Sequence, residues 1–238
     1  MKEKKILRIG LLGFGSMGRT HAFAIRNLPF FYGELPFSAE IRGLCTAHPE
    51  SAKQAAEEFG IPLVFEREDE LLEHPEIDVI DVCTPNRYHA DTLCRAIACG
   101  KHVLCEKPLC TSPEEARRIL ALPLMEGQVT GMVFNNRHLA PVLRAKQLID
   151  EGRLGRILTF RGAYLHNSAI DPSRPAGWKQ DKTVCGGGVL FDLGSHLIDL
   201  TSWLCGEFRA VSGLSQIAFP TRIGMDRAAW QTNADEGF

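Results

Sequence analysis

The residue whose setting most suggests chemistry is Lys107, in the run Cys105-Glu106-Lys107-Pro108. Residues 101–105 are mostly apolar, follow a Cys-Gly turn signal and predict a short buried strand. Because proline favours extended geometry in the residue before it, Lys107 is expected at the end of that strand. Ligands bind at the carboxyl ends of strands in open parallel sheets, so Lys107 would place a cation at the rim of a cofactor site. The alternative is an ordinary solvated lysine at a strand–loop junction.

A second polar group lies in a predicted helix from about Val189 to Cys205, just after three consecutive glycines. Beside an apolar stripe, a narrow polar stripe is formed by residues spaced i, i+4, i+7 and i+11: Asp192, His196, Asp199 and Trp203. The remaining positions are mostly apolar or small, so these groups would be largely buried and would need partners. They are either a satisfied core pair or acid–base residues. The glycines, which allow close backbone approach, favour a functional site.

A glycine turn near the N-terminus is typical of nucleotide binding. A buried strand predicted over Ile6 to Leu12 runs into Gly13-Phe14-Gly15-Ser16-Met17-Gly18 and then a helical segment, Arg19 to Leu28. In this fingerprint the first glycine allows a tight turn, the second lets a pyrophosphate approach, and the third lets helix and strand pack closely. The phosphates would lie against amides at the helix N-terminus. A simple glycine-rich turn is the alternative.

The residues after the second predicted strand, Ala39 to Cys45, bear on the choice of cofactor. The fingerprint expects an acidic residue here to bind the ribose hydroxyls, and the sequence has Thr46-Ala47-His48 instead. Without a carboxylate, a ribose phosphate is not repelled, and Thr46 and His48 could donate hydrogen bonds to one. We therefore predict NAD(P)(H) with a slight preference for NADP. His48 equally well marks the start of a helix at Pro49.

Strands and helix-sized segments alternate through the first half of the chain, after an aromatic loop predicted over residues 29–36. This order predicts an α/β fold with a doubly wound parallel sheet, and its rim would carry three loops: 13–18, 84–89 and 106–108. After Phe134 the pattern changes to a helix and two long strands, Arg156 to Tyr164 and Arg209 to Pro220. The predicted domains are therefore residues 1–134, which bind the dinucleotide, and residues 135–238.

The composition and net charge of the chain argue against several classes of function. The formal charge of -2 offers no basic field for nucleic acid or for a membrane surface, and no apolar run approaches a membrane span. The N-terminal apolar run enters a glycine turn instead of a signal cleavage site. Eight scattered cysteines without a Cys-x-x-Cys motif predict reduced thiols instead of a disulfide framework or a zinc site. We expect a cytoplasmic protein without a metal, a nucleic-acid partner or a membrane partner.

Five motifs in order, GFGSMG, TPNxxH, CEKP, Asn135-Asn-Arg137 and GGGVLFDLGSHLIDL, resemble those of the glucose-fructose oxidoreductase and inositol dehydrogenase family (Gfo/Idh/MocA). The resemblance spans essentially the whole chain. It implies a Rossmann domain followed by an α+β domain whose open, mostly antiparallel sheet mediates homo-oligomers. It also implies that the chain is truncated within that second domain.

The resemblance further implies roles for individual residues. Lys107, Asp192 and His196 would be catalytic, and Arg137 and Trp178 would join them in binding substrate. Cofactor contacts would come from the rim loops and the second strand end: Gly13, Phe14, Gly15, Ser16, Met17, Gly18, Thr46, Thr84, Pro85, Asn86, His89, Glu106 and Lys107. The sequence departs from the family pattern at Thr46, and at Asn136, where a tyrosine is common.

Together these features predict a NAD(P)-dependent oxidoreductase that transfers hydride between nicotinamide and a sugar, inositol or related polyol. His196 would exchange the hydroxyl proton, and Lys107 would hydrogen-bond the substrate oxygen and stabilise its developing charge. Asp192 would orient the imidazole or contact the substrate. The alternative is a non-catalytic dinucleotide-binding regulator on the same fold. A regulator could lose Lys107 or His196, and the presence of both favours the enzyme.

Overall fold

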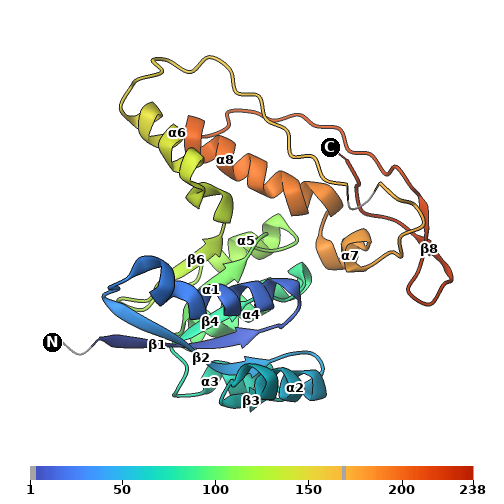
Figure 1. Cartoon of the computed structure of the whole chain (residues 1–238). Coiled ribbons are helices and arrows are strands. Elements are labelled where there is room, and N and C mark those ends of the chain that lie inside the picture. The colour runs from blue at the N-terminus through green and yellow to red at the C-terminus, as the bar shows by residue number, and fades with distance from the viewer. Residues whose placement is uncertain (1–3, 168–169, 238) are drawn as a thin grey trace. The chain divides into compact units, whose positions relative to one another are not determined.

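The computed structural model describes residues 4–167 and 170–237 of the chain (Figure 1). The chain divides into two compact units, Met1–Val133 and Phe134–Phe238. The first unit alternates strands and helices in the order β1 (Lys5–Leu12), α1 (Ser16–Tyr32), β2 (Phe37–Cys45), α2 (Pro49–Phe59), β3 (Leu63–Phe65), α3 (Glu68–Glu73), β4 (Val79–Val82), η1 (Asn86–Tyr88), α4 (His89–Ala98), β5 (His102–Glu106), α5 (Pro113–Leu120) and β6 (Thr130–Val133).

All six strands are parallel and lie in the order β3-β2-β1-β4-β5-β6, which confirms the predicted doubly wound sheet. The chain winds outward in both directions from β1. Because β1, β4 and β5 are neighbours that run the same way, the loops that follow them lie at one edge of the sheet. That edge is where open α/β sheets bind ligands.

The core of this unit has two layers, one on each face of the sheet. Successive strand residues point to opposite faces, so Leu11 packs with Ala22 of α1 and Ala55 of α2, whereas Leu12 packs with a cluster that includes Leu93 of α4. Burial on both faces explains why these strands are almost continuously apolar.

One loop prediction is wrong in part. Helix α1 continues through Pro29 to Tyr32 and ends before Gly33, whose φ is +58°, so only the later part of the predicted aromatic loop lies outside the helix. Proline removes one helical hydrogen bond, but its fixed φ is compatible with a helix. Its aromatic neighbours Phe30, Phe31 and Tyr32 are exposed.

The second unit contains mostly short helices. They are η2 (Asn135–His138), α6 (Ala140–Asp150), η3 (Trp178–Gln180), α7 (Lys182–Cys185), the π-helical η4 (Leu190–Gly194) and α8 (Ser195–Cys205), followed by β7 (Thr221–Ile223) and β8 (Ala229–Gln231). Among the described residues, β7 and β8 form the only antiparallel sheet.

The two long strands predicted for this unit are wrong. Within the described residues, Arg156–Tyr164 pairs with no strand, and Arg209–Pro220 contributes only one bridge, between Gln216 and Gly237. A strand is held by hydrogen bonds to a neighbouring strand, and an alternating sequence cannot supply that neighbour by itself. The homo-oligomer expected through this sheet stays a prediction.

In the ranges that the structure covers, no helix is long and apolar enough to cross a membrane. None of the eight cysteines, all of which lie in the described residues, forms a disulfide, and four of them are buried: Cys45, Cys105, Cys110 and Cys185.

Candidate active site

The glycine turn after β1 has the geometry of a dinucleotide loop. Gly13 has φ +93°, and a Cβ there would lie 2.7 Å from the Cys83 carbonyl oxygen, while a Cβ on Gly18 would overlap the carbonyl of Gly13. These two glycines are therefore required by the fold itself. A Cβ on Gly15 would meet no atom within 4 Å, so space is left where the fingerprint places a pyrophosphate. Helix α1 begins directly after Gly15, and its first amides have no side-chain cap.

Substitution of Gly15 by alanine should separate binding from folding. Gly15 has φ -72° and open space around it, so the thermal stability of Gly15→Ala is expected to match the wild type. The added methyl group would crowd a bound pyrophosphate at a cost of about 1–3 kcal/mol, or roughly 5- to 150-fold in dissociation constant. Fluorescence titration with NADH and NADPH measures this. Gly213→Ala, also in open space, is the matched control, and equal affinity in both variants would contradict the assignment of the loop.

The loop after β4 is braced by a histidine. His89 is fully buried, and its Nδ1 and Nε2 lie 2.7 Å and 2.8 Å from the carbonyl oxygens of Pro108 and Thr84. Burial lowers the pKa of His89, so its neutral ring donates to one carbonyl at a time. The ring thus ties the 84–89 loop to the 106–108 loop, and its predicted contact with a cofactor stays a prediction. The buried Thr84 Oγ1 has no hydrogen-bond partner among the described residues, so a bound cofactor could satisfy it.

Lys107 lies where the sequence predicts it, directly after the last residue of β5. Its backbone N–H donates to Oε2 of the buried Glu106 at 3.1 Å, and its peptide bond with Pro108 is cis. The hydrogen bond to Glu106 holds the Lys107 main chain at the same sheet edge as the glycine turn.

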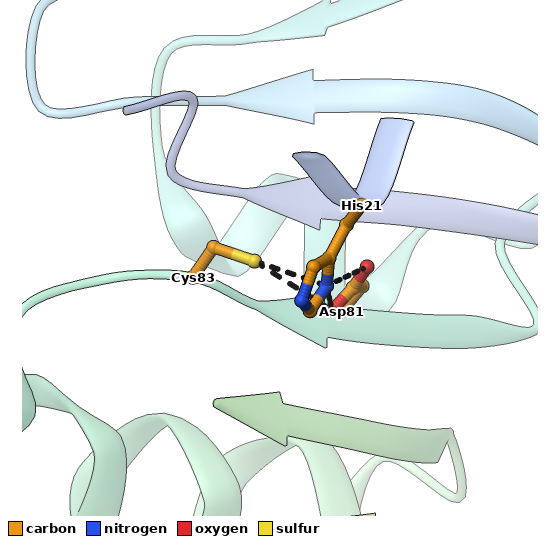
Figure 2. Close-up of side chains that lie close together, drawn as sticks. All are labelled: His21, Asp81 and Cys83. Carbon is orange, nitrogen blue, oxygen red and sulfur yellow. Dashed lines mark hydrogen bonds and ion pairs between the residues drawn. The ribbon is translucent and has the colours of Figure 1, made fainter. Parts of the chain in front are cut away.

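Behind Glu106 lies a buried network that the sequence reasoning missed. Figure 2 shows the His21 ring pointing from α1 toward Asp81 and Cys83. His21 Nδ1 is 3.0 Å from both Asp81 carboxylate oxygens, and Nε2 is 3.1 Å from Glu106 Oε1. Two signals could have found it: a carboxylate inside the apolar strand Val-Ile-Asp81-Val, and a histidine three residues beyond Gly18 on the buried face of α1.

Charge in this network favours a proton over a metal ion. His21, Asp81 and Cys83 offer three ligand atoms within 4.8 Å of one another, a spacing that could hold a metal. Burial alone would lower the pKa of His21, but hydrogen bonds with Asp81, Cys83 and Glu106 outweigh it and raise the pKa to about 12. A metal needs an unprotonated nitrogen, so the bound proton competes with it. That the protein needs no metal stays a prediction.

In the second unit, Asp192 and His196 lie on successive helical segments. Asp192 is in the π-helical turn η4, and its Oδ2 accepts from Lys179 Nζ at 2.6 Å. His196, in the first turn of α8, is buried, with the Phe134 and Tyr164 rings centred 6.0 Å and 6.1 Å away. The sequence predicts a single α-helix here. The π turn shifts the directions of the side chains before it relative to those after it, compared with that regular helix. Such turns are frequent at functional sites.

The glycines before this helix do allow close approach. A Cβ on Gly188 would overlap the backbone of Asp235, whose carbonyl accepts from Val189 N at 2.9 Å and whose Oδ2 accepts from Leu190 N at 2.7 Å. Asp235, far along the chain, thereby caps the helix that carries Asp192.

Two predicted substrate-binding residues have protein partners here. Arg137 donates from Nε to Asp199 Oδ2 at 2.7 Å and also pairs through Nη2, and its guanidinium lies 5.7 Å from the Trp203 ring. Arg137 is thus the partner of Asp199 and Trp203, the last two residues of the polar stripe predicted on the helix. Trp178 is exposed, with Lys179 Nζ 5.8 Å from its ring. Substrate contacts by both residues stay predictions. Lys179, which the sequence reasoning did not single out, is the partner of Asp192.

Two family models match the chain. An oxidoreductase family with an NAD-binding Rossmann fold matches residues 7–134, and the GFO/IDH/MocA C-terminal domain matches residues 142–235. Together they cover most of both units, so the family expected from the five motifs is confirmed.

Individual proteins agree with the family models. Levoglucosan dehydrogenase of Pseudarthrobacter phenanthrenivorans is 37% identical over 216 residues, which are 91% of this chain and 55% of the relative. D-glucoside 3-dehydrogenase of Escherichia coli is 28% identical over 230 residues, 94% of this chain and 61% of the relative. The solved structure of levoglucosan dehydrogenase in complex with NADH superposes with TM-score 0.92 at 34% identity, over 98% of this chain and 62% of that one. The chain thus spans less than two thirds of these proteins, and it belongs to the Gfo/Idh/MocA family of oxidoreductases.

Proposed function

We propose that the protein is a NAD(P)-dependent dehydrogenase acting on the CH–OH group of a sugar, inositol or related polyol. The observation that carries the proposal is the rim of the first unit. A glycine turn with an open central position follows β1, and Lys107 follows β5 at the same sheet edge. The names of the relatives, dehydrogenases of levoglucosan and of D-glucosides, support the substrate class.

The chain's own residues would bind and orient. The open space at Gly15 and the uncapped amides of α1 would hold a pyrophosphate, and the partnerless Thr84 hydroxyl would gain a hydrogen bond. When bound, the cofactor supplies the hydride chemistry. The Lys107 ammonium would hydrogen-bond the substrate oxygen and stabilise negative charge that develops there.

Proton exchange is assigned to the second unit. His196 would accept the hydroxyl proton during oxidation and return it during reduction, which is a task suited to an imidazole at neutral pH. Asp192, paired with Lys179, would contact the substrate or orient the imidazole. The ion pair with Lys179 fixes the position of the Asp192 carboxylate for that role.

Cofactor choice is proposed to depend on Thr46, which follows β2 where a ribose-binding carboxylate is expected. Thr46 Oγ1 donates to the His48 carbonyl at 2.9 Å. The turn after β2 therefore presents an uncharged side chain where a carboxylate is expected. NADP(H) is expected to bind at least as well as NAD(H). Thr46→Asp should weaken NADPH binding at least about tenfold through like-charge repulsion and spare NADH. Fluorescence titration measures both. A strong wild-type preference for NADH would contradict the proposal.

The function is tested by a dehydrogenase screen of sugars and inositols with both cofactors. The absorbance of the reduced nicotinamide measures turnover. Turnover of at least one such hydroxyl compound is expected. Cofactor binding without turnover of any of them would favour the non-catalytic regulator.

A further inference from the structure

One buried ring joins the elements that carry the three rim loops. His21 belongs to α1, which starts at the glycine turn, Asp81 belongs to β4, and Glu106 ends β5. All three side chains are buried: His21 is 9%, Asp81 1% and Glu106 6% exposed. The ring contacts both carboxylates, so a single side chain fixes the spacing between the strands that lead to Thr84 and to Lys107.

The contacts define the ionisation of the ring. A neutral imidazole carries one N–H, whereas both nitrogens of His21 lie within 3.1 Å of carboxylate oxygens, which accept hydrogen bonds. Both nitrogens must therefore donate, and the ring is an imidazolium. A further titratable group that faces the ring is Cys83, whose Sγ is 3.4 Å from Nδ1. Burial raises the pKa of that thiol to about 11, so it stays neutral. The network then carries one positive and two negative charges.

We propose that His21 is a positioning residue for Lys107, acting through Glu106. Only the expected effect of His21 on turnover rests on the proposed function. One Glu106 oxygen accepts from His21 Nε2, and the other accepts from the Lys107 backbone N–H at 3.1 Å. The imidazolium thus holds the carboxylate that holds the Lys107 peptide.

Removal of the ring would act on this chain of contacts in a defined way. Asp81 and Glu106 would be two buried carboxylates without the cation between them, which is costly. Glu106 would then turn away or take up a proton, and in either case it would loosen its hydrogen bond with the Lys107 amide. His21→Gln alone therefore risks unfolding.

A charge-matched double variant avoids that risk. His21→Gln with Asp81→Asn removes one positive and one negative charge and leaves the net charge of the network at -1, as in the wild type. Amide hydrogen exchange at Lys107 is the direct readout and needs neither cofactor nor substrate. Exchange at Lys107 is expected to be at least about tenfold faster in the double variant, while amides in the middle of β1 keep their rates. Unchanged exchange at Lys107 would overturn the proposal.

The ionisation is tested in the wild type by NMR of 15N-labelled histidine, with the His21 signals assigned by their loss in the double variant. Two protonated ring nitrogens are expected at pH 9, and a ring that is neutral there would overturn the imidazolium. His138→Gln, at an exposed histidine, is the matched control and should leave Lys107 exchange and the His21 signals unchanged.

Turnover separates this inference from the proposed function. If the protein oxidises a sugar or polyol, the double variant should lose kcat about tenfold or more, because misplacement of a catalytic group costs rate steeply. NADH or NADPH affinity should change little. If no such substrate is oxidised, the proposed function fails, and the Lys107 exchange rate alone decides the positioning role.

Discussion

Replacement of Lys107 by alanine is expected to lower kcat for the sugar or polyol substrate about 100-fold or more, which is the usual cost of losing one electrostatic donor. Lys107 follows β5 at the edge where open α/β sheets bind ligands, and its backbone N–H, which donates to Glu106, is kept in the variant. The loop should therefore keep its place, and NADH or NADPH binding should stay nearly intact. Steady-state kinetics and fluorescence titration separate the two effects.

The matched control is Lys53→Ala in the same unit. Lys53 forms solvent-exposed ion pairs with Glu50 and Glu66, which contribute little to stability. Its kcat should equal that of the wild type. Lys107→Ala with a normal kcat would remove Lys107 from the chemistry, and a loss confined to cofactor affinity would make it a binding residue.

The first unit follows closely from the sequence because its signals are local. Strands β1 and β2 end at Leu12 and Cys45, as predicted, and helix α2 begins at Pro49. Strands buried on both faces must be apolar throughout, so their pattern depends little on context. Pro29 misled the prediction because a proline lowers helical stability without forbidding a helix.

The second unit follows less closely because its structure depends on distant partners. The segment Arg156–Tyr164 alternates like a strand, but a ladder needs a neighbour that no local pattern supplies. Similarly, the π turn at Asp192 begins where Asp235, more than forty residues later in sequence, caps the backbone. A search for a helical periodicity of about 100° per residue assumes a regular α-helix, so it cannot detect such a turn.

In the candidate site, too, the locally encoded features could be predicted and the long-range contacts could not. The glycine turn and the strand-end Lys107 could be predicted because the turn and the strand end are encoded in adjacent residues. The His21 network joins residues 60 and 85 positions apart, and the unusual residue types in each segment do not say which of them pair. Contacts at such separations are set by the sheet order, which the alternation of elements does not specify.

Substitution of His196 should give the other large effect. His196→Ala is expected to lower kcat about 100-fold or more, in the range typical of a lost general acid–base group. The variant should also lose the pH dependence of kcat that proton exchange by the imidazole produces. Because His196 is buried against Phe134 and Tyr164, the alanine variant also leaves a cavity, so a rate loss alone would not identify the proton transfer.

His196→Gln resolves this. Glutamine fills much of the space and forms hydrogen bonds, but it cannot exchange a proton near neutral pH. If proton exchange is the role of His196, the glutamine variant should be nearly as slow as the alanine variant, with a similarly flat pH profile and wild-type thermal stability. A glutamine variant with the wild-type rate, beside a slow alanine variant, would instead show that His196 supports α8 by packing and that another group moves the proton.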